Sequence, residues 1–357
     1  DENYLNGVST FDLILMAKHI LGVQLLDSPY KMIAADINNS GTITTLDAIQ
    51  LRKLILNVTT SFANNTSWRF VDGSYLFPVP NNPWFETFPE IININDLSGQ
   101  LFGQDFIGVK IGDLNGSVQA NALDIEPRNL RGMFYFDVDE MHLKAGNEYR
   151  IAFTAADIAK VQGYQGTLKL DPAAIELKDL VGGVAKAENF GMRFAGEGMI
   201  TFSWNRAPIA SAEGPADVLF TLVVQAMADA DLSDVLAISS RYTLAEAYDK
   251  SDELMDLGLR FNNGPATELP FELYQNKPNP FGDRTVIGFQ LPEDSEVTIT
   301  IHDVSGKAIR LIRDNYAKGY NQLTLTRREL NNATGVLYYT VTAGEHTATK
   351  KMVVMSR

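Results

Sequence analysis

Twelve residues near the start of the chain, 36 to 47, constrain its fold more than any other segment. They read Asp-Ile-Asn-Asn-Ser-Gly-Thr-Ile-Thr-Thr-Leu-Asp, with oxygen-bearing side chains at positions one, three and five, a glycine at position six and a carboxylate at position twelve. Ca²⁺ takes about six to eight oxygen ligands, and a tight loop converges on one ion only where a residue turns sharply. Gly41 supplies that turn. We predict a Ca²⁺ site formed by Asp36, Asn38, Ser40, Thr42 and Asp47.

The helix expected after this loop belongs to an internal repeat with a period of 35 residues. Residues 6–21 align with residues 41–56, and each copy runs from a loop into a helix that begins with serine or threonine. Apolar residues recur at helical spacing in both copies, at Leu13, Met16 and Ile20 and at Ile49, Leu51, Leu54 and Ile55. The repeat predicts two loop-plus-helix units, each without the helix that precedes the loop in a full EF-hand.

Two such units in tandem resemble a type I dockerin, and this resemblance implies a second Ca²⁺ in the first loop. Asp1, Asn3 and Asp12 are in register there, but Leu5 replaces an oxygen ligand and Asn6 replaces the glycine. The first loop is therefore either a calcium-free remnant or a second site beside Asp12. The other oxygens of such a site would come from Asp1 and Asn3 or from another segment. That segment would carry Asp113, Asn115 and Ser117, which repeat the one-three-five spacing, although an ordinary Asn-Gly turn is the alternative interpretation of these residues.

Length and composition limit the number of domains and the kinds of partner that this chain can have. A chain of 357 residues with 45% hydrophobic residues should hold two or three domains, each with its own core. The net charge of −14 argues against nucleic acid and anionic membrane surfaces as partners. The absence of cysteine excludes disulfides and thiolate chemistry. The first loop begins at the first residue, so we expect the chain to be the tail of a longer polypeptide.

The middle of the chain consists of short strand-like runs separated by glycine, proline and aspartate. The predicted strands cover residues 132–138, 149–155, 163–171, 198–204 and 218–224. Such a series predicts an antiparallel β-sandwich over residues 121–263. Residues 163–177, in which a strand ends at Asp171-Pro172 and an apolar residue follows, resemble a cohesin. An immunoglobulin-like sandwich is the alternative, and the cohesin interpretation suggests that the first two domains dock within one chain.

The last segment, residues 264–357, follows an Asn-Asn-Gly-Pro linker and shows clean strand alternation. Residues 275–281 read Gln-Asn-Lys-Pro-Asn-Pro-Phe, residues 303–307 Asp-Val-Ser-Gly-Lys, and residues 335–339 Gly-Val-Leu-Tyr-Tyr. Together with the terminal Lys-Lys-Met-Val-Val they closely resemble the type A C-terminal sorting domain of type IX secretion substrates of Bacteroidetes. The residues that carry this sorting signal are Gln275, Asn276, Pro278, Asn279, Pro280, Phe281, Gly306, Gly335, Lys350 and Lys351.

This resemblance implies three partners and a location. The partners are the type IX translocon, its outer-membrane shuttle and a sortase-like protease, all acting on residues 264–357. The location is the cell surface or the extracellular medium, after export across the outer membrane. A sandwich of seven strands or nearly so, independent of the other domains, is expected for this segment.

Motifs of catalysis are missing from the sequence. The four histidines have no metal-ligand spacing, and no phosphate-binding loop or nucleophile motif occurs. Tyr164, Trp204, Tyr338 and Tyr339 could line a sugar site, which leaves a glycan ligand as an open alternative to a role in the core. We expect a non-catalytic part of an adhesin or scaffold type of surface protein. Its fold would be mainly β and multidomain: a dockerin-like helical module at residues 1–120, with Ca²⁺ as its cofactor, followed by two antiparallel β-sandwich domains. Accessory modules of a secreted hydrolase, or a dockerin–cohesin docking module, are the alternatives.

Overall fold

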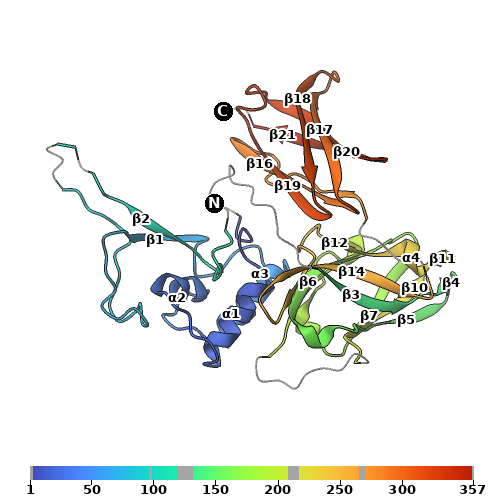
Figure 1. Cartoon of the computed structure of the whole chain (residues 1–357), viewed down its shortest axis with the longest axis horizontal. Helices are drawn as coiled ribbons and strands as arrows, with labels where there is room; N and C mark the ends of the chain where they lie inside the picture. The colour runs from blue at the N-terminus through green and yellow to red at the C-terminus, as the bar shows by residue number, and fades with distance from the viewer. Residues whose placement is uncertain are drawn as a thin grey trace.

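The structure of the protein, a computed structural model, describes residues 3–95, 99–100, 102–118, 132–207, 217–264 and 270–355. Its buried hydrophobic residues form three clusters, which run from Val8 to Leu114, from Phe134 to Phe261 and from Leu273 to Val354. The fold is mainly β, as predicted (Figure 1). No helix in the described part of the chain is long and apolar enough to cross a membrane.

The first cluster holds three helices, α1 (Thr10–Ile20), α2 (Pro29–Ala35) and α3 (Thr45–Ile55). Helices α1 and α3 are the two repeat helices, and both begin with a capping box. Ser9 caps α1 and Thr44 caps α3, with Asp12 and Asp47 closing the boxes from the third helical position. Helix α2 corrects the expectation that no helix precedes the second loop. It is capped by Ser28 and begins at Pro29, so α2 and α3 flank residues 36–44.

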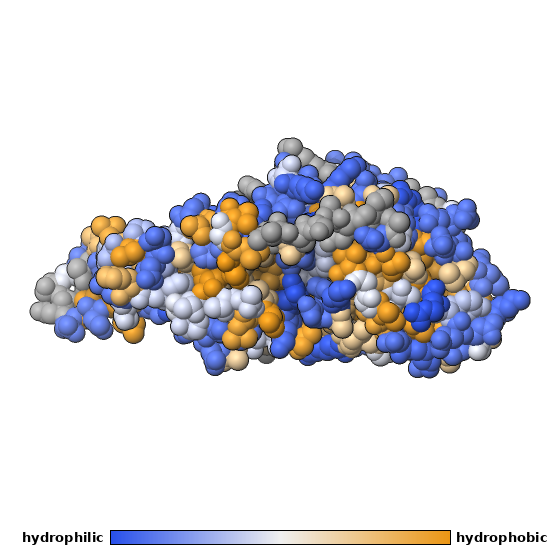
Figure 2. Space-filling model, turned by 90° about the horizontal axis from the view of Figure 1, so that it is seen from below, coloured by the Kyte–Doolittle hydropathy of each residue, from blue (hydrophilic) through white to orange (hydrophobic). Residues whose placement is uncertain are grey.

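The insert after α3 contributes one antiparallel ribbon, β1 (Trp68–Asp72) with β2 (Phe106–Lys110). In Figure 1 the ribbon leaves the helices as an arm, and the loop after β1 returns beside α2, where Phe77 contacts Tyr30. Several large apolar side chains are exposed along the insert, namely Phe70, Leu76, Phe85, Ile91, Phe102 and Phe106. Figure 2 shows one face of the whole molecule, on which apolar patches alternate with hydrophilic surface.

The second cluster lies between two sheets, so this part of the chain is a β-sandwich. One sheet has the order β5-β10-β7, and the other has the order β3-β14-β13-β6-β9-β8, with β12 also paired to β6. All pairs are antiparallel except β3 with β14, which is parallel. The strands and the short helix of this unit are β3 (Met133–Asp139), β4 (His142–Leu143), β5 (Glu148–Phe153), β6 (Val161–Leu170), β7 (Ile175–Gly182), β8 (Phe190–Gly191), β9 (Met199–Asn205), β10 (Phe220–Ala226), β11 (Ala230–Asp231), α4 (Leu232–Val235), β12 (Leu236–Ser239), β13 (Glu246–Asp249) and β14 (Leu254–Asn262).

The third cluster lies between a three-stranded sheet, β15-β16-β19, and a four-stranded sheet, β18-β17-β20-β21. These seven described strands confirm the predicted antiparallel sandwich. Their bounds are β15 (Glu272–Leu273), β16 (Arg284–Leu291), β17 (Ser295–Asp303), β18 (Ala308–Tyr316), β19 (Gly319–Thr326), β20 (Gly335–Ala343) and β21 (His346–Val354).

The third unit contacts the sandwich before it through polar side chains. Ser239 Oγ donates to Glu272 Oε2 at 2.9 Å, and Tyr274 Oη accepts from the Ser240 main-chain N–H at 3.1 Å. Lys169 Nζ lies 3.8 Å from Glu272 Oε1. These polar contacts join the two units, and the independence of residues 264–357 stays a prediction.

Candidate functional site

The loop of residues 36–47 is organised by its two aspartates. Asp36 Oδ1 accepts from the Ser40 main-chain N–H and Asp36 Oδ2 from the Gly41 N–H, each at 2.8 Å. Asp47 Oδ1 accepts from the Asn38 N–H at 3.1 Å, and its Oδ2 accepts from Thr44. Gly41 has φ +77°, the left-handed turn that the sequence predicted. Both ends of the loop are thereby folded toward one centre.

The residues of this loop fit a Ca²⁺ ion by their chemistry. Asn38 Oδ1 is buried and accepts no hydrogen bond from any described residue. Position three of the loop therefore offers an oxygen acceptor that a cation could use. Burial raises the pKa of Asp36, and the neighbouring Asp47 carboxylate raises it further. A cation would offset both effects. The described residues contain no group of three or more histidine, cysteine, aspartate or glutamate side chains placed to hold a metal. This loop carries two carboxylates, and its other oxygens are amide, hydroxyl and carbonyl.

A second centre joins two segments that are far apart in the sequence. Asp12 Oδ1 accepts from the Leu114 N–H at 2.7 Å, and Asp113 accepts from the N–H groups of residues 116 to 118 at 2.8 to 3.1 Å. Ser117 Oγ donates to the Gly7 carbonyl at 3.1 Å. Of the residues proposed for a second site, the structure thus brings Asp113 and Ser117 beside Asp12. Asp1 lies outside the described residues, and Asn3 lies in the turn that precedes Gly7.

The two centres have corresponding hydrogen bonds. Ser40 Oγ donates to the Thr42 carbonyl at 3.3 Å, as Ser117 does to the Gly7 carbonyl. Gly7, which sequence reasoning missed, therefore stands where Thr42 stands in the continuous loop. A Cβ on Gly7 would lie 2.6 Å from the Val118 backbone, so only glycine permits this approach.

The electrostatics of the second centre also suit a cation. Full burial, with the nearby Asp113 carboxylate as a further cause, raises the pKa of Asp12 to about 8. Burial likewise raises the pKa of Asp113. Burial lowers the pKa of Lys110 to about 8, while both carboxylates act in the opposite direction on this lysine. Lys110 offers one positive charge to the two buried carboxylates, and a bound cation would stabilise their charged forms further.

The first turn of α1 is bonded to strands β6 and β9 of the sandwich. The Thr10 N–H donates to Gln165 Oε1 at 2.7 Å, and Thr10 Oγ1 lies 2.6 Å from Ser203 Oγ. Gln165 Nε2 in turn donates to Glu246 Oε1 at 3.0 Å. The N–H groups of a first helical turn have no partner within the helix, so the sheet supplies one for α1.

Apolar and charged side chains extend this contact along α1. The Phe11 ring lies 5.3 Å from the Tyr248 ring, and Lys18 forms an ion pair with Asp252 at 3.0 Å. Ile14 covers Gly163 of β6, where an added Cβ would lie 3.0 Å from Ile14 Cδ1. Gly163 therefore allows the helix to approach the sheet closely.

The C-terminal end of α3 is bonded to the same sheet. Thr201 Oγ1 donates to the Leu56 carbonyl at 2.6 Å, and Thr243 Oγ1 donates to the Ile55 carbonyl at 2.7 Å. Arg52 donates to the side-chain oxygen of Asn205. The last carbonyls of a helix are also without intrahelical partners. One face of the sandwich thus caps the start of α1 and the end of α3.

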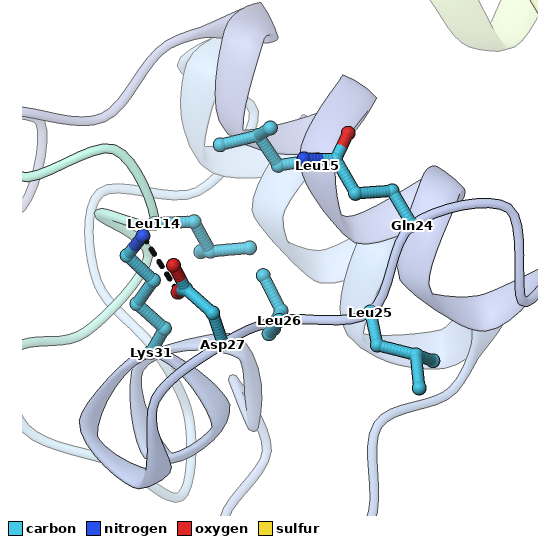
Figure 3. Close-up of a pocket in the computed structure, with 7 residues that line it drawn as sticks. All are labelled: Leu15, Gln24, Leu25, Leu26, Asp27, Lys31 and Leu114. Carbon is cyan, nitrogen blue, oxygen red and sulfur yellow. Dashed lines mark ion pairs between the residues drawn. The ribbon is translucent and has the colours of Figure 1, made fainter.

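Two hollows among the described residues were considered as ligand sites. One is a cavity of about 90 Å³. Its lining combines four leucines with Gln24 and with the Lys31–Asp27 ion pair (Figure 3). This volume is well below that of an ordinary ligand pocket. A hollow of about 450 Å³ lies on the sandwich, where Glu176 is the one titratable residue of its lining. The lining residues are Leu170, Pro172, Ile175, Glu176, Leu177, Ala195, Gly196, Gly198, Ile200 and Met227.

The aromatic residues considered for a sugar site belong to the cores. Tyr164 and Trp204 stack on each other at 5.0 Å inside the sandwich, and Trp204 is 5% exposed. Tyr339 is fully buried in the third unit. A glycan site on Trp204 is therefore wrong. Tyr338 lies half-buried on the outer face of its sheet and stacks on His302.

The opening segment of the predicted sorting signal is attached to the last strand. Gln275 Nε2 donates to the Lys351 carbonyl at 2.7 Å, and Asn279 Oδ1 accepts from the Val353 N–H at 2.8 Å. Phe281 is fully buried and exchanges main-chain bonds with residues 353 and 355. Residues at the two ends of the domain therefore meet along the edge of β21 that does not pair with β20.

Other residues of this signal set the turns around that edge. Asn276 is buried, and its side chain donates to Thr285 Oγ1 and to the Pro278 carbonyl. Gly306 and Gly335 have positive φ. Gly306 ends the turn between β17 and β18, and Gly335 begins β20 opposite Val354 of β21. Pro280 lies between Asn279 and Phe281 in the attached segment, and Lys350 and Lys351 lie on β21.

Comparison with known proteins identifies the third unit. Residues 277–355 match the family described as Secretion system C-terminal sorting domain. The search of curated proteins found no match.

Solved structures that resemble part of the chain include cohesins. One is the seventh ScaB type I cohesin from Pseudobacteroides cellulosolvens, 17% identical, covering 37% of this chain and 89% of that chain, with a TM-score of 0.27. Another is a type I cohesin–dockerin complex from Clostridium thermocellum, 16% identical, covering 38% and 94%, with a TM-score of 0.29. A third is the type II cohesin dyad of the ScaA scaffoldin from Acetivibrio cellulolyticus, 12% identical, covering 48% and 61%, with a TM-score of 0.27.

The family match leads to one conclusion about this chain. Residues 277–355 form a type IX secretion sorting domain, and the protein is exported across the outer membrane to the cell surface or the extracellular space.

Proposed function

We propose that the chain is a non-catalytic, calcium-stabilised part of an adhesin or scaffold type of surface protein. In this proposal the helical unit of residues 1–120 is a dockerin-like module bound to the cohesin-like sandwich of its own chain, and residues 264–357 are read by the translocon, the shuttle and the sortase-like protease. The observation that carries the docked arrangement is the capping of both α1 and α3 by one sheet, through Thr10 with Gln165 and through Leu56 with Thr201.

Ca²⁺ would be held by Asp36, Asn38, Ser40, Thr42 and Asp47. A second ion would be held by Asp12, Asp113, Asn115, Ser117 and the Gly7 carbonyl. When bound, the ions supply positive charge that neutralises the paired aspartates and fixes both loops. Asp12 and Asp47 lie in the first turns of α1 and α3, so fixing the loops also fixes the helix starts that meet the sheet.

Hydrogen exchange on the full chain, with calcium and with chelator, tests this proposal. We expect the chelator to increase exchange in α1, in α3 and also in strands β6 and β9, because the contact between them depends on the loops. Faster exchange in the loops alone would contradict a calcium-dependent contact. A hydrolase screen on the same preparation tests the non-catalytic role, and turnover abolished by a point substitution in this chain would overturn it.

A further inference from the structure

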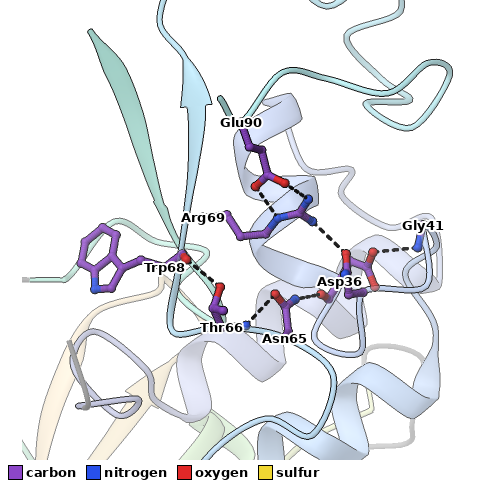
Figure 4. A network of polar contacts seen from close by, with 8 residues as sticks. Asp36, Gly41, Asn65, Thr66, Trp68, Arg69 and Glu90 are labelled. Carbon is purple, nitrogen blue, oxygen red and sulfur yellow. Dashed lines mark hydrogen bonds and ion pairs between the residues drawn. The ribbon is translucent and has the colours of Figure 1, made fainter. Parts of the chain in front are cut away.

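The calcium loop is held from outside by a network that the insert provides (Figure 4). Arg69 on β1 donates from Nε and Nη2 to the two carboxylate oxygens of Glu90, each at 2.8 Å. Its third nitrogen, Nη1, donates to Asn39 Oδ1 at 2.9 Å. The guanidinium also lies over the Phe88 ring, 4.9 Å from its centre. All three guanidinium nitrogens are thus engaged, which fixes the position of this side chain.

Asn39, which Arg69 contacts, has an unusual backbone conformation. Asn39 lies between Asn38 and Ser40 and has φ +56°, a conformation that asparagine tolerates better than most residues. A second bond from the insert, from Asn65 Nδ2 to the Asp36 carbonyl at 2.9 Å, holds the start of the same turn. The insert therefore restrains the loop at two places, one on either side of Asn38.

We propose that Arg69, fixed by Glu90, is a positioning residue for the calcium loop. By holding Asn39 it keeps the side chains of positions three and five directed at one centre before the ion arrives. A preorganised loop loses less conformational freedom on binding, so it binds the ion more tightly. Because Arg69 is paired with Glu90, the restraint adds no net charge beside the cation. This inference rests on the proposed Ca²⁺ site of residues 36–47.

Calorimetric titration of the calcium-depleted full chain tests this role, with Asp36→Asn used to identify the binding event of this loop. Asn39→Gly removes the acceptor but keeps the left-handed turn, and Arg69→Lys keeps the charge but cannot hold Glu90 and Asn39 together. We expect each to weaken binding about tenfold, the lower end for outer-shell partners of metal ligands. Asn39→Asp retains an acceptor for Arg69 and adds a carboxylate near the cation, so it should bind at least as tightly as the wild type. Asn64→Gly, at an exposed neighbouring position, should leave it unchanged.

Two further measurements separate positioning from a general loss of stability. The double variant Asn39→Gly/Arg69→Lys should bind no more weakly than either single variant, because both remove one bond. In chelator the thermal midpoints of the variants should equal that of the wild type. Affinity losses that add in the double variant would overturn the inference. So would a weaker affinity that is accompanied by a lower thermal midpoint in chelator, or single variants that bind calcium as tightly as the wild type. A wild-type chain that shows no binding event sensitive to Asp36→Asn would instead overturn the proposed calcium site itself.

Discussion

Gly7 and Ser117, 110 positions apart, are joined by a 3.1 Å hydrogen bond from the serine hydroxyl to the glycine carbonyl. Ser40 makes the same bond to the carbonyl of Thr42 within a continuous loop. The first repeat lacks the oxygen and the glycine that its own loop needs, and residues 113–118 stand in for both. The insert therefore does not merely follow the helices, because its last residues complete the turn that begins α1.

Replacing Asp113 tests this completed loop. Asp113→Asn should reduce the calcium bound per chain from two ions to one, because it removes a carboxylate that also organises the turn through three N–H groups. Asp105→Asn, at an exposed position of the same insert, is the matched control and should keep two ions. Equilibrium dialysis gives the stoichiometry. A single ion in the wild type would contradict the second site.

Replacing Asp47 tests the continuous loop. Asp47→Asn removes the carboxylate at position twelve, and the rise in thermal midpoint that calcium gives the helical unit should be mostly lost. An ion that binds only the folded state at about 100 times its dissociation constant stabilises by about 2.7 kcal/mol. The exposed Asp27→Asn should keep the full rise. Scanning calorimetry with and without calcium makes the comparison, and an equal rise in all three proteins would contradict the assignment.

The buried Asp12 predicts a pH dependence of the calcium-free protein. Its pKa is about 8 in the folded chain against 3.8 unfolded, chiefly because of burial. Between these values the folded state holds a proton that the unfolded state has lost, so the free energy of unfolding should fall as the pH rises. Thermal midpoints in chelator should therefore decrease from pH 5 to pH 7.5. Asp12→Asn should flatten the decrease, although Asp36 and Asp113, whose pKa values are also raised, keep part of it. A midpoint that rises over this range would contradict the sign.

The attached edge of β21 predicts which changes impair export. Residues 265–357 fused to an inert periplasmic reporter should carry it to the surface of a type IX-competent cell. Asn279→Ala removes the acceptor of the Val353 N–H and should reduce the surface fraction, because an edge strand is left partly unpaired. Asn315→Ala, at an exposed position on the opposite edge strand β18, is the control. Protease shaving of whole cells measures the outcome, and a reporter that remains periplasmic would contradict the family assignment.

The features that could be predicted from the sequence are those whose signal lies within a short segment of the chain. The twelve-residue loop, the two capped helices, five sandwich strands and the sorting domain each carry their signal within a short segment. Helix α2 escaped notice because seven residues, with four apolar ones in succession from Met32 to Ala35, show no helical period, although Ser28-Pro29 is a helix start signal. The partnership of Gly7 with Ser117 has no local signal at all.

The contact between helices and sandwich was expected only as a general arrangement, and its residues could not be named. Gln165, Ser203 and Glu246 are polar residues in strands, and in an isolated sheet such positions face water. Their burial became visible only with α1 in place. A usable signal was present in the repeat, since Thr10 and Ile14 recur as Thr45 and Ile49. A repeated pair of this kind on the surface of two helices indicates a docking face.

That repeat provides the most direct test of the docked arrangement. Ile14 is 3% exposed beneath the sandwich, whereas Ile49, at the equivalent position of α3, is 48% exposed. Ile14→Asp places a charge against β6 and should release the helical unit, whereas Ile49→Asp should change nothing. Hydrogen exchange of β6 and β9 in the calcium-loaded full chain should increase in the first variant and match the wild type in the second. Equal exchange in both variants would contradict the docking of the helical unit on its own sandwich.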